Sequence, residues 1–312
     1  MKVLVTGGSG FIGSHVVDAL IEAGHEPRIF DVIDSPWHDP AEFDTFIGDL
    51  TDVDAVKLAA RGCDAIAHLG AIADVSHVAA DPAYAERVNS GGTSNVLEAA
   101  RAAGVGRVVY ASTIWVYDGC DAASVDEDSL LGLPRHPYTG QKIAGEMYCT
   151  SYAELFDVDY TILRFGIPYG PRARPAAVIP QFFKSALAGR PLTIAGGGKQ
   201  SRRFTYVGDI ARGVVTALAP QARNRVYNLA SEETVTILEL ATAVSEIVGD
   251  TDILHTPGRA GDFRGAEISS ARIARELGWR ATTPLAEGLS LYFGWLTGEA
   301  PVDVDPDPDP VG

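Results

Sequence analysis

Short apolar runs alternate with amphipathic stretches along the first half of the chain. The runs with the length and composition of buried strands are residues 2–6, 26–31, 44–48, 64–70, 107–112 and 159–164. The stretches with helical periodicity are residues 11–23, 53–60, 83–103 and 138–155. This alternation predicts an α/β fold, with a Rossmann-type, doubly wound parallel sheet and helices on both of its faces. Ligands of such sheets bind beyond the carboxyl ends of the strands.

The regular alternation ends after about Gly166. Two loops follow, "GIPYGPRARPAAVIP" (166–180) and "IAGGGKQSRRF" (194–204), which are rich in glycine with proline or arginine. We therefore expect one domain from residues 1–165, with further elements from 204–230. A smaller C-terminal α/β region, mainly from residues 166–298, is expected to bind the substrate. Residues 299–312 are acidic, rich in proline and nearly free of bulky apolar groups, which predicts a disordered tail.

The charge balance limits the partners that the chain can have. It contains 41 acidic and 25 basic residues, so its net charge of −16 disfavours binding to nucleic acid or to an anionic membrane. The three cysteines form neither a disulfide framework nor a metal-ligand spacing, which favours a reducing compartment and predicts no metal site. No window approaches the ~20 apolar residues of a membrane span. We expect a soluble, cytoplasmic protein.

Glycines at a three-residue spacing follow the first predicted strand. In "VTGGSGFIG", Gly7, Gly10 and Gly13 permit a tight turn and a close approach of backbone N–H groups to a pyrophosphate. A plain strand-to-helix turn would use the same residues. Asp31, at the end of the second predicted strand, favours a dinucleotide site because its carboxylate can accept the adenosine ribose hydroxyls. Since that carboxylate would repel a 2′-phosphate, we expect NAD rather than NADP.

Tyr138 and Lys142 are four residues apart in a predicted helix, in a chain with only five lysines. Residues at this spacing share a helix face, so an incidental surface pair is one interpretation. The other is a catalytic base with its activator. A cation ~4 Å away at an effective dielectric of about 20 contributes on the order of 4 kcal/mol. With help from an oxidised nicotinamide, this is enough to bring a tyrosine pKa from near 10 to neutrality.

Two hydroxyl side chains follow the fifth predicted strand, at the same edge of the sheet. They are Ser112 and Thr113 in "YASTIWVY". Either could orient a substrate hydroxyl beside Tyr138, or could instead cap the following turn.

Together these motifs resemble the extended short-chain dehydrogenase/reductase family, specifically its nucleotide-sugar epimerases. The resemblance covers nearly the whole chain, from "VTGGSGFIGSHV" through "HLGA", "YTGQK" and "LRFGIPYGPR" to "SRRFTYVGDIARG", "YNLAS", "PGRAGD" and "ELGW". It implies NAD as cofactor, a UDP-linked sugar as substrate and a homodimer formed through two helices. The implied NAD-binding residues are Gly7, Gly10, Phe11, Ile12, Gly13, Asp31, Asp49, Leu50, Leu69, Gly70, Ala71, Asn89, Ser112, Tyr138 and Lys142.

The resemblance also implies catalytic roles and a substrate site. By position, Tyr138 would be the acid/base, Lys142 its activator and ribose ligand, and Thr113 the partner of the substrate hydroxyl. The implied substrate-binding residues are Thr113, Tyr138, Ile167, Arg174, Arg202, Arg259 and Asp262. Among them, Arg202 and Arg259 would hold the diphosphate, and Asp262 would lie near the nucleoside ribose.

Departures from the family pattern limit the reactions that the resemblance implies. Dehydratase and decarboxylase relatives carry an acidic residue where this chain has Ile114 and Trp115, so water elimination is disfavoured. Asp118 replaces the final glycine of that motif, and Gln141 replaces a common serine before the lysine.

Two further positions bear on the sugar. Ile167 stands where many hexose epimerases have asparagine, and Arg174 matches an arginine that meets a C6 carboxylate in uronate epimerases. The alternative for Arg174 is an ordinary surface loop residue that pairs with acidic neighbours.

Our leading hypothesis is NAD-dependent epimerisation at C4 of a UDP-linked sugar, of the glucose/galactose or glucuronate/galacturonate type, through a 4-keto intermediate. A reductase or dehydrogenase with net NAD(H) turnover would use the same residues. A non-catalytic nucleotide sensor would have no reason to keep Thr113, Tyr138 and Lys142 together.

Overall fold

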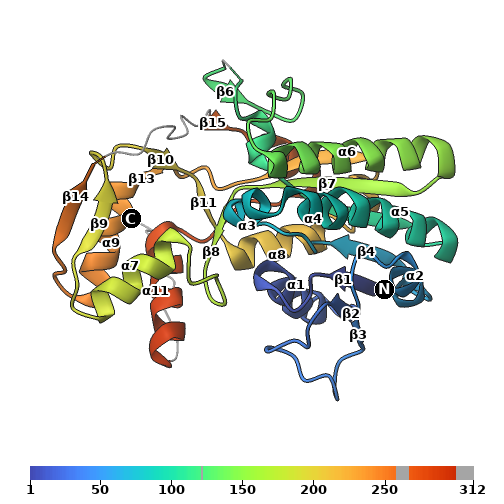
Figure 1. Cartoon of the computed structure of the whole chain (residues 1–312), viewed down its shortest axis with the longest axis horizontal. Coiled ribbons are helices and arrows are strands. Elements are labelled where there is room, and N and C mark those ends of the chain that lie inside the picture. Colours follow the sequence, from blue (N-terminus) through green and yellow to red (C-terminus); the bar gives the residue numbers. More distant parts are fainter. Residues whose placement is uncertain (121, 258–266, 300–312) are drawn as a thin grey trace, which may run out of the picture.

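Seven parallel strands form the central sheet of the computed structural model, which describes residues 1–120, 122–257 and 267–299 (Figure 1). The strands are β1 (Lys2–Thr6), β2 (Glu26–Asp31), β3 (Thr45–Ile47), β4 (Ala65–His68), β5 (Arg107–Thr113), β7 (Asp159–Phe165) and β12 (Arg225–Leu229). Their order is β12-β7-β5-β4-β1-β2-β3, and all neighbours are parallel. The predicted Rossmann-type fold is confirmed. The strand order reverses between β1 and β4, which places a ligand crevice at their carboxyl ends.

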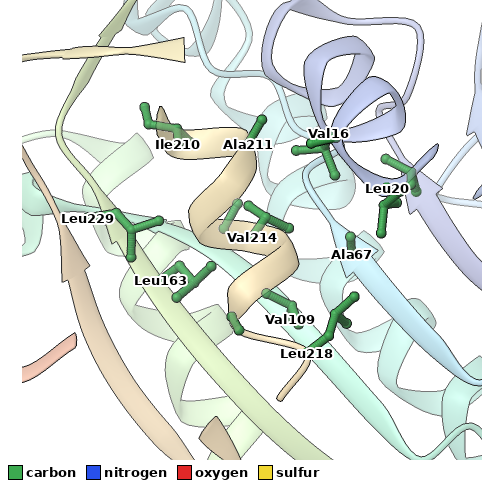
Figure 2. Close-up of a cluster of buried hydrophobic side chains, with 14 of the residues drawn as sticks. Val16, Leu20, Ala67, Val109, Leu163, Ile210, Ala211, Val214, Leu218 and Leu229 are labelled. Carbon is green, nitrogen blue, oxygen red and sulfur yellow. The ribbon is translucent and has the colours of Figure 1, made fainter. Parts of the chain in front are cut away.

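Helices cover both faces of this sheet. Those on one face are α1 (Phe11–Glu22) and α8 (Val207–Thr216), and those on the other are α2 (Val53–Ala60), α5 (Gly92–Ala103) and α6 (Pro137–Phe156). Figure 2 shows the first layer, in which Val16 and Leu20 of α1 and Val214 of α8 pack over Ala67 and Val109 of the sheet. Each buried aliphatic side chain contributes about 1.5–3 kcal/mol, so these layers hold the strands whose ends form the site.

The predicted helix over residues 83–103 is interrupted. It consists of α4 (Pro82–Glu86), a π-helical turn (Arg87–Gly91) and α5. Helical backbone runs through all of these residues, so the predicted extent is confirmed. The π-helical turn within it was not predicted, because apolar periodicity does not detect a single inserted residue in a helical turn. The π-helical turn contains the buried Asn89.

A second, smaller α/β region lies beside the sheet (Figure 1). Its core is a separate cluster that includes Tyr169, Phe183, Leu192, Leu240 and Leu289. Its elements are β8 (Ile167–Tyr169), α7 (Val178–Leu187), β9 (Leu192–Ala195), β10 (Ser201–Arg202), β11 (Phe204–Tyr206), β13 (Val235–Thr236), α9 (Ile237–Val248), β14 (Ile253–Thr256) and α11 (Leu285–Thr297). β12 is a strand of the large sheet, and α8 packs on that sheet. The chain therefore crosses between the two regions more than once. The assignment of residues 166–298 to substrate binding stays a prediction.

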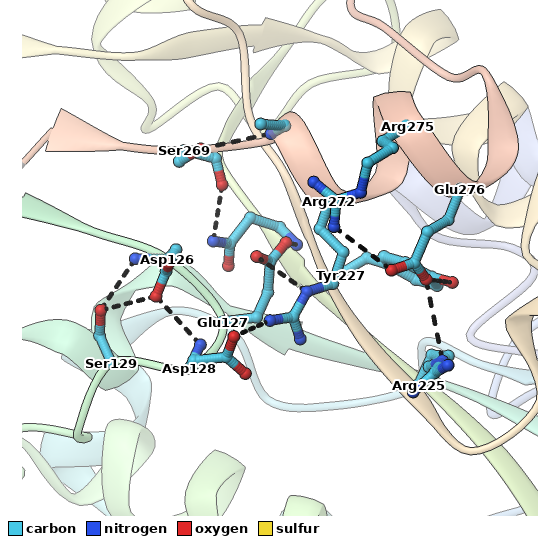
Figure 3. A network of polar contacts seen from close by, with 12 residues as sticks. Asp126, Glu127, Asp128, Ser129, Arg225, Tyr227, Ser269, Arg272, Arg275 and Glu276 are labelled. Carbon is cyan, nitrogen blue, oxygen red and sulfur yellow. Dashed lines mark hydrogen bonds and ion pairs between the residues drawn. The ribbon is translucent and has the colours of Figure 1, made fainter.

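Ion pairs anchor the chain where it returns to the large sheet. The elements concerned are β6 (Ser124–Val125), β15 (Glu267–Ile268) and α10 (Ala271–Leu277). β15 pairs with β6, and Arg272 on α10 contacts Glu127 at 3.6 Å and also Asp128 (Figure 3).

The predicted substrate residues Arg259 and Asp262, and the predicted tail beyond residue 299, lie outside the described residues.

The remaining elements are α3 (Val75–Ala80) and two 3-10 turns (Ile114–Tyr117 and Pro220–Ala222). Within the described ranges, no helix combines the length and the apolar character needed to cross a membrane. The same part of the chain contains no group of three or more side chains placed to bind a metal ion.

A buried ion pair fixes α6 against the sheet. Arg164 of β7 donates from Nε and Nη2 to the two carboxylate oxygens of Glu146, at 3.0 and 2.7 Å, and both side chains are at most 5% exposed. Ser112 Oγ donates to the same carboxylate at 2.5 Å, and Arg164 Nη1 donates to the Tyr117 hydroxyl at 2.6 Å. The carboxylate is therefore satisfied by neighbours from two strands.

Removal of one partner should leave the other charge buried without compensation. We expect Glu146→Ala to lower the free energy of unfolding by about 3–5 kcal/mol, measured by urea denaturation. Glu154→Ala, at an exposed position of the same helix, should change it by less than about 0.5 kcal/mol. Equal effects of the two substitutions would contradict this role of the ion pair.

Candidate active site

A cavity of about 570 Å³ lies at the carboxyl edge of the sheet, where the strand order reverses. The predicted cofactor-binding residues that line it are Gly7, Gly10, Phe11, Ile12, Gly13, Asp31, Asp49, Leu50, Leu69, Gly70, Ala71, Ser112, Tyr138 and Lys142. Five strand ends and α6 thus bring most of the predicted set into one space. Of that set, Asn89 is not part of the lining.

The glycine loop is shaped by close backbone packing. Gly7 has a left-handed φ of 73°, and a Cβ atom there would lie 2.7 Å from the backbone nitrogen of Gly70. A Cβ atom at Gly13 would overlap the Gly7 carbonyl oxygen. α1 begins directly after this loop and has no acidic residue in its first turn. Its N-terminal amides and its dipole are therefore suited to a pyrophosphate, and the residues fit a dinucleotide cofactor.

Asp31 connects the glycine loop to the end of β2. Its carboxylate accepts hydrogen bonds from the backbone nitrogens of Ser9 (3.0 Å) and Val32 (2.8 Å). Burial raises the pKa of Asp31 above its ordinary value, and these N–H donors oppose the rise. The carboxylate is thus held in one orientation at the cavity wall, as the predicted contact with ribose hydroxyls requires.

Asn89 lies behind the cavity wall and supports it. Its side chain accepts from the backbone nitrogen of Ile72 (2.8 Å) and donates to the Ile72 carbonyl (3.0 Å) and to Gln141 Oε1 (2.8 Å). It therefore joins the loop after β4 to α6. Gln141, the departure from the family serine, serves as the partner on α6.

Lys142 projects from α6 into the interior of the site. The residue is 5% exposed, and its Nζ donates to the Ala111 carbonyl at 2.7 Å and lies 5.0 Å from the Tyr110 ring centroid. Nζ is 5.9 Å from the ring centroid of Tyr138, which also lines the cavity. The pair predicted from its spacing therefore faces the cavity and is not an incidental surface contact. Burial lowers the pKa of Lys142 to about 8.

The energetics of Tyr138 differ from the sequence-based estimate. Burial raises the pKa of Tyr138 to about 12, and the charge of Arg174 opposes this rise. A unit charge at 5.9 Å contributes about 3 kcal/mol at an effective dielectric of about 20, equivalent to a fall of about two in pKa. With its ammonium at that distance from the ring centre, Lys142 offsets part of the rise that burial causes in the Tyr138 pKa. A second cation, as an oxidised nicotinamide would provide, is needed as well.

The two hydroxyls after β5 have structural partners. Ser112 lines the cavity, but its hydroxyl donates to Glu146. Thr113 is 8% exposed, its Oγ1 accepts from the Trp115 backbone nitrogen at 3.3 Å, and it is not part of the cavity lining. The capping role considered for these side chains is thus present at Thr113, whose substrate role stays a prediction.

The predicted substrate residues are dispersed. Arg174 lines the cavity, as a substrate-binding residue would, and also pairs with Asp74 at 3.1 Å, as an ordinary surface arginine would. The structure is consistent with both interpretations. Ile167 is half-buried in β8, where its neighbour Pro168 lines the cavity. Arg202 is in β10 and donates to the Ser201 carbonyl. Neither Ile167 nor Arg202 belongs to the cavity lining.

Sequence reasoning missed three contributors to the site. Glu146 follows Lys142 by four residues on the same helix, and that repeated spacing was a usable signal. Tyr110 lies beneath the Lys142 ammonium, and Asp74 pairs with Arg174. Neither of these two had a sequence signal, because both contacts join segments that are far apart in the chain. Asp118, which replaces a motif glycine, has φ of −61° and requires no glycine.

The burial of the Lys142 ammonium should lower the free energy of unfolding by an amount that depends on pH. Its pKa of about 8 is below the ordinary 10.5, so the unfolded chain binds more protons between these values and the free energy of unfolding rises with pH there. We expect Lys142→Met to stabilise the protein by up to about 3 kcal/mol at pH 7, with the gain shrinking between pH 8 and 10.5. Urea denaturation at several pH values measures this gain. Lys184→Met, at an exposed site, is the control, and a gain independent of pH would contradict the assignment.

Relatives of known name cover nearly the whole chain. A UDP-glucose 4-epimerase of Mycolicibacterium smegmatis is 34% identical, over 93% of this chain and 96% of the relative. A dTDP-glucose 4,6-dehydratase of Streptomyces niveus is 30% identical, over 95% and 92%. A UDP-N-acetyl-alpha-D-glucosaminuronate decarboxylase of Bacillus cytotoxicus is 34% identical, over 82% and 83%. The relatives therefore share a fold and differ in reaction.

Solved structures agree with the fold and with the cofactor. The UDP-glucose 4-epimerase of Thermotoga maritima, solved with UDP-glucose, superposes with a TM-score of 0.88 at 29% identity, covering 96% of this chain and 99% of that one. The Thermus thermophilus UDP-glucose 4-epimerase, solved with NAD, gives 0.86 at 32% identity, covering 96% and 100%. The model of the NAD dependent epimerase/dehydratase family matches residues 3–230. The chain belongs to the NAD dependent epimerase/dehydratase family, and NAD is its cofactor.

Proposed function

We propose that this protein epimerises C4 of a UDP-linked sugar, of the glucose/galactose or the glucuronate/galacturonate type. The observation that carries the proposal is the presence of Tyr138 and Lys142 in the same cavity as the glycine loop and Asp31. An acid/base and a dinucleotide site are thereby adjacent, as reversible oxidation of a carbinol requires. The 4-epimerases among the relatives and solved structures support this choice.

In the proposed reaction, the protein moves one proton and holds the cofactor and the sugar. NAD, when bound, supplies the reversible oxidation of C4, and no net redox change results. Tyr138 takes the C4 hydroxyl proton on its phenolic oxygen and later returns it. Lys142 uses one of its three donors on the Ala111 carbonyl in the described structure, which leaves two for the nicotinamide ribose. Its charge stabilises the phenolate form of Tyr138.

The surroundings of Asp74 and Glu146 favour epimerisation over water elimination, which needs a protonated acid near the sugar. Asp74 is kept ionised, because hydrogen bonding from Ser76 and the charge of Arg174 lower its pKa. Glu146 is bound to Arg164 and Ser112. Ile114 and Trp115, the two residues after Thr113, are apolar. None of these groups is placed to donate a proton to a leaving hydroxyl.

Arg174 is our candidate for the residue that distinguishes a uronate from a neutral sugar. It lines the cavity, its side chain is half-exposed, and its contact with Asp74 is a surface ion pair of modest strength. A substrate carboxylate can replace Asp74 at this guanidinium at little cost. Ile167, Arg202, Arg259 and Asp262 stay proposed substrate residues.

We also propose a homodimer in a reducing compartment such as the cytoplasm. The exposed side of α6 carries Met147, Leu155 and Phe156, large apolar residues that a partner helix would cover. The three cysteines are free thiols.

The proposed activity is testable by proton NMR of UDP-glucose, UDP-N-acetylglucosamine and UDP-glucuronate incubated with the purified protein. We expect inversion at C4 of one of them without stoichiometric NADH. Tyr138→Phe should reduce the rate by at least about 100-fold, since it removes the acid/base. Tyr148→Phe on the same helix, outside the cavity lining, should leave the rate unchanged. Accumulation of NADH or of a stable keto product would favour the reductase or dehydrogenase alternative.

The sugar is tested through Arg174. If Arg174 reads a carboxylate, Arg174→Ala should lower kcat/KM for UDP-glucuronate about tenfold or more and that for UDP-glucose by much less. Arg190→Ala, at an exposed position, controls for the loss of surface charge. Equal effects on the two substrates would remove the uronate assignment.

A further inference from the structure

One carboxylate on the outer side of α1 joins two loops that border different parts of the cavity. Asp18 Oδ1 is 2.8 Å from His38 Nε2, and Asp18 Oδ2 is 2.7 Å from Arg172 Nη1. His38 belongs to the arm formed by residues 32–44, which follows Asp31. Arg172 belongs to the loop formed by residues 170–174, which ends at Arg174. The Asp18 contacts therefore connect the loop beyond the predicted adenosine site with the loop on the substrate side.

The arm is folded so that His38 reaches Asp18. Ser35 Oγ accepts from the backbone nitrogens of Trp37 and His38, both at 3.2 Å, and its hydroxyl can donate to His38 Nδ1 at 3.1 Å. A neutral His38 then carries its proton on Nε2 and donates it to Asp18. The His38 side chain is 4% exposed. At the other end of the arm, Ser9 Oγ donates to the Ile33 carbonyl at 2.9 Å.

The substrate-side loop is held by the same helix and the same arm. His15, one turn before Asp18, contacts the Pro171 carbonyl through Nε2 at 3.0 Å. The Arg172 guanidinium lies 5.1 Å from the Trp37 ring centroid. The ring centroids of Trp37 and Trp295, which is in α11, are 6.3 Å apart. Arg172 adopts a left-handed φ of 64°, which a non-glycine residue adopts only at a cost. The loop conformation that presents Arg174 to the cavity therefore depends on these contacts.

We propose that Asp18 is a positioning residue that couples occupation of the dinucleotide site to binding of the nucleotide sugar. A ligand at Asp31 restrains the start of the arm. The arm holds Asp18 through His38 and Arg172 through Trp37, and so stabilises the loop that carries Arg174. By thermodynamic reciprocity, a ligand on the substrate side must stabilise the dinucleotide side by the same factor. The inference rests on the proposed nucleotide-sugar site, but it concerns binding and not turnover.

Asp18 carries the charge that this coupling requires. Burial acts to raise the pKa of Asp18, but the hydrogen bond from His38 and the nearby Arg172 outweigh it and leave the pKa below its ordinary value. The carboxylate accepts from both loops at once. An amide of the same shape accepts through only one of its two terminal atoms, so Asp18→Asn separates the two loops without leaving a void.

The test measures the affinity of nucleotide-free protein for NAD by titration calorimetry, with and without saturating UDP-glucuronate, in a Tyr138→Phe background that does not turn the sugar over. With Asp18 intact we expect UDP-glucuronate to tighten NAD binding on the order of tenfold, within the usual range of coupling between sites. Asp18→Asn should reduce that factor to less than about twofold. Glu22→Gln, which removes the same charge from an exposed position of α1, should keep the parent factor. A merely structural role of Asp18 would weaken NAD binding equally with and without UDP-glucuronate.

A double-substitution cycle checks the route. If Asp18 acts through Arg172, Arg172→Gln should lose the coupling as well, and the double variant should lose no more than either single one. The inference is overturned if UDP-glucuronate leaves NAD affinity unchanged with Asp18 intact, or if Asp18→Asn keeps the full factor. Intact coupling without C4 inversion would refute the proposed function alone. Inversion without coupling would refute this inference alone.

Discussion

Lys142 carries a positive charge into the interior of the molecule, and the candidate site depends on how that charge is held. The Ala111 carbonyl accepts from the ammonium, and the ring of Tyr110 lies beneath it. Together they replace part of the hydration that the charge has lost. The same burial that makes the Lys142 ammonium costly makes the phenolate of Tyr138 costly. The two groups are complementary, because a phenolate beside an ammonium is neutral as a pair.

The rest of α6 keeps this pair in register with the sheet. Tyr138, Lys142 and Glu146 follow one another at four-residue intervals on one side of the helix. They contact, in turn, the cavity, the end of β5 and the buried guanidinium of Arg164. Gly145 allows close packing, since a Cβ atom there would overlap the Tyr110 hydroxyl. Lys142 and Glu146 thus fix the helix against the sheet, and Tyr138 faces the cavity one turn earlier.

Much of the fold and part of the site could be predicted from the sequence, because both follow local patterns. Strand runs, the glycine spacing and Asp31 are local features, and parallel strands with their ends at one edge bring them together without further information. The π-helical turn at Asn89 was not predictable in this way, because a single inserted residue leaves the apolar pattern nearly unchanged. The partners of Ser112 and Thr113 also depend on side-chain orientation, which a sequence motif does not encode.

The proposed substrate side was the least predictable, since it combines loops of both regions. Arg174 meets Asp74, one hundred positions earlier, and is presented by a loop that Asp18 and His15 hold. Such contacts depend on how two separately packed cores face one another. Each core follows its own apolar pattern, but no pattern within either one specifies the contact between them.

The central claim is that burial keeps Tyr138 protonated until positive charges from Lys142 and the cofactor lower its pKa. The direct measurement is the tyrosinate absorbance of the parent protein minus that of Tyr138→Phe across pH, with and without bound NAD. We predict a pKa near 10 or above without NAD, and a value several units lower with it. A Tyr138 pKa that is the same in both states would contradict the account.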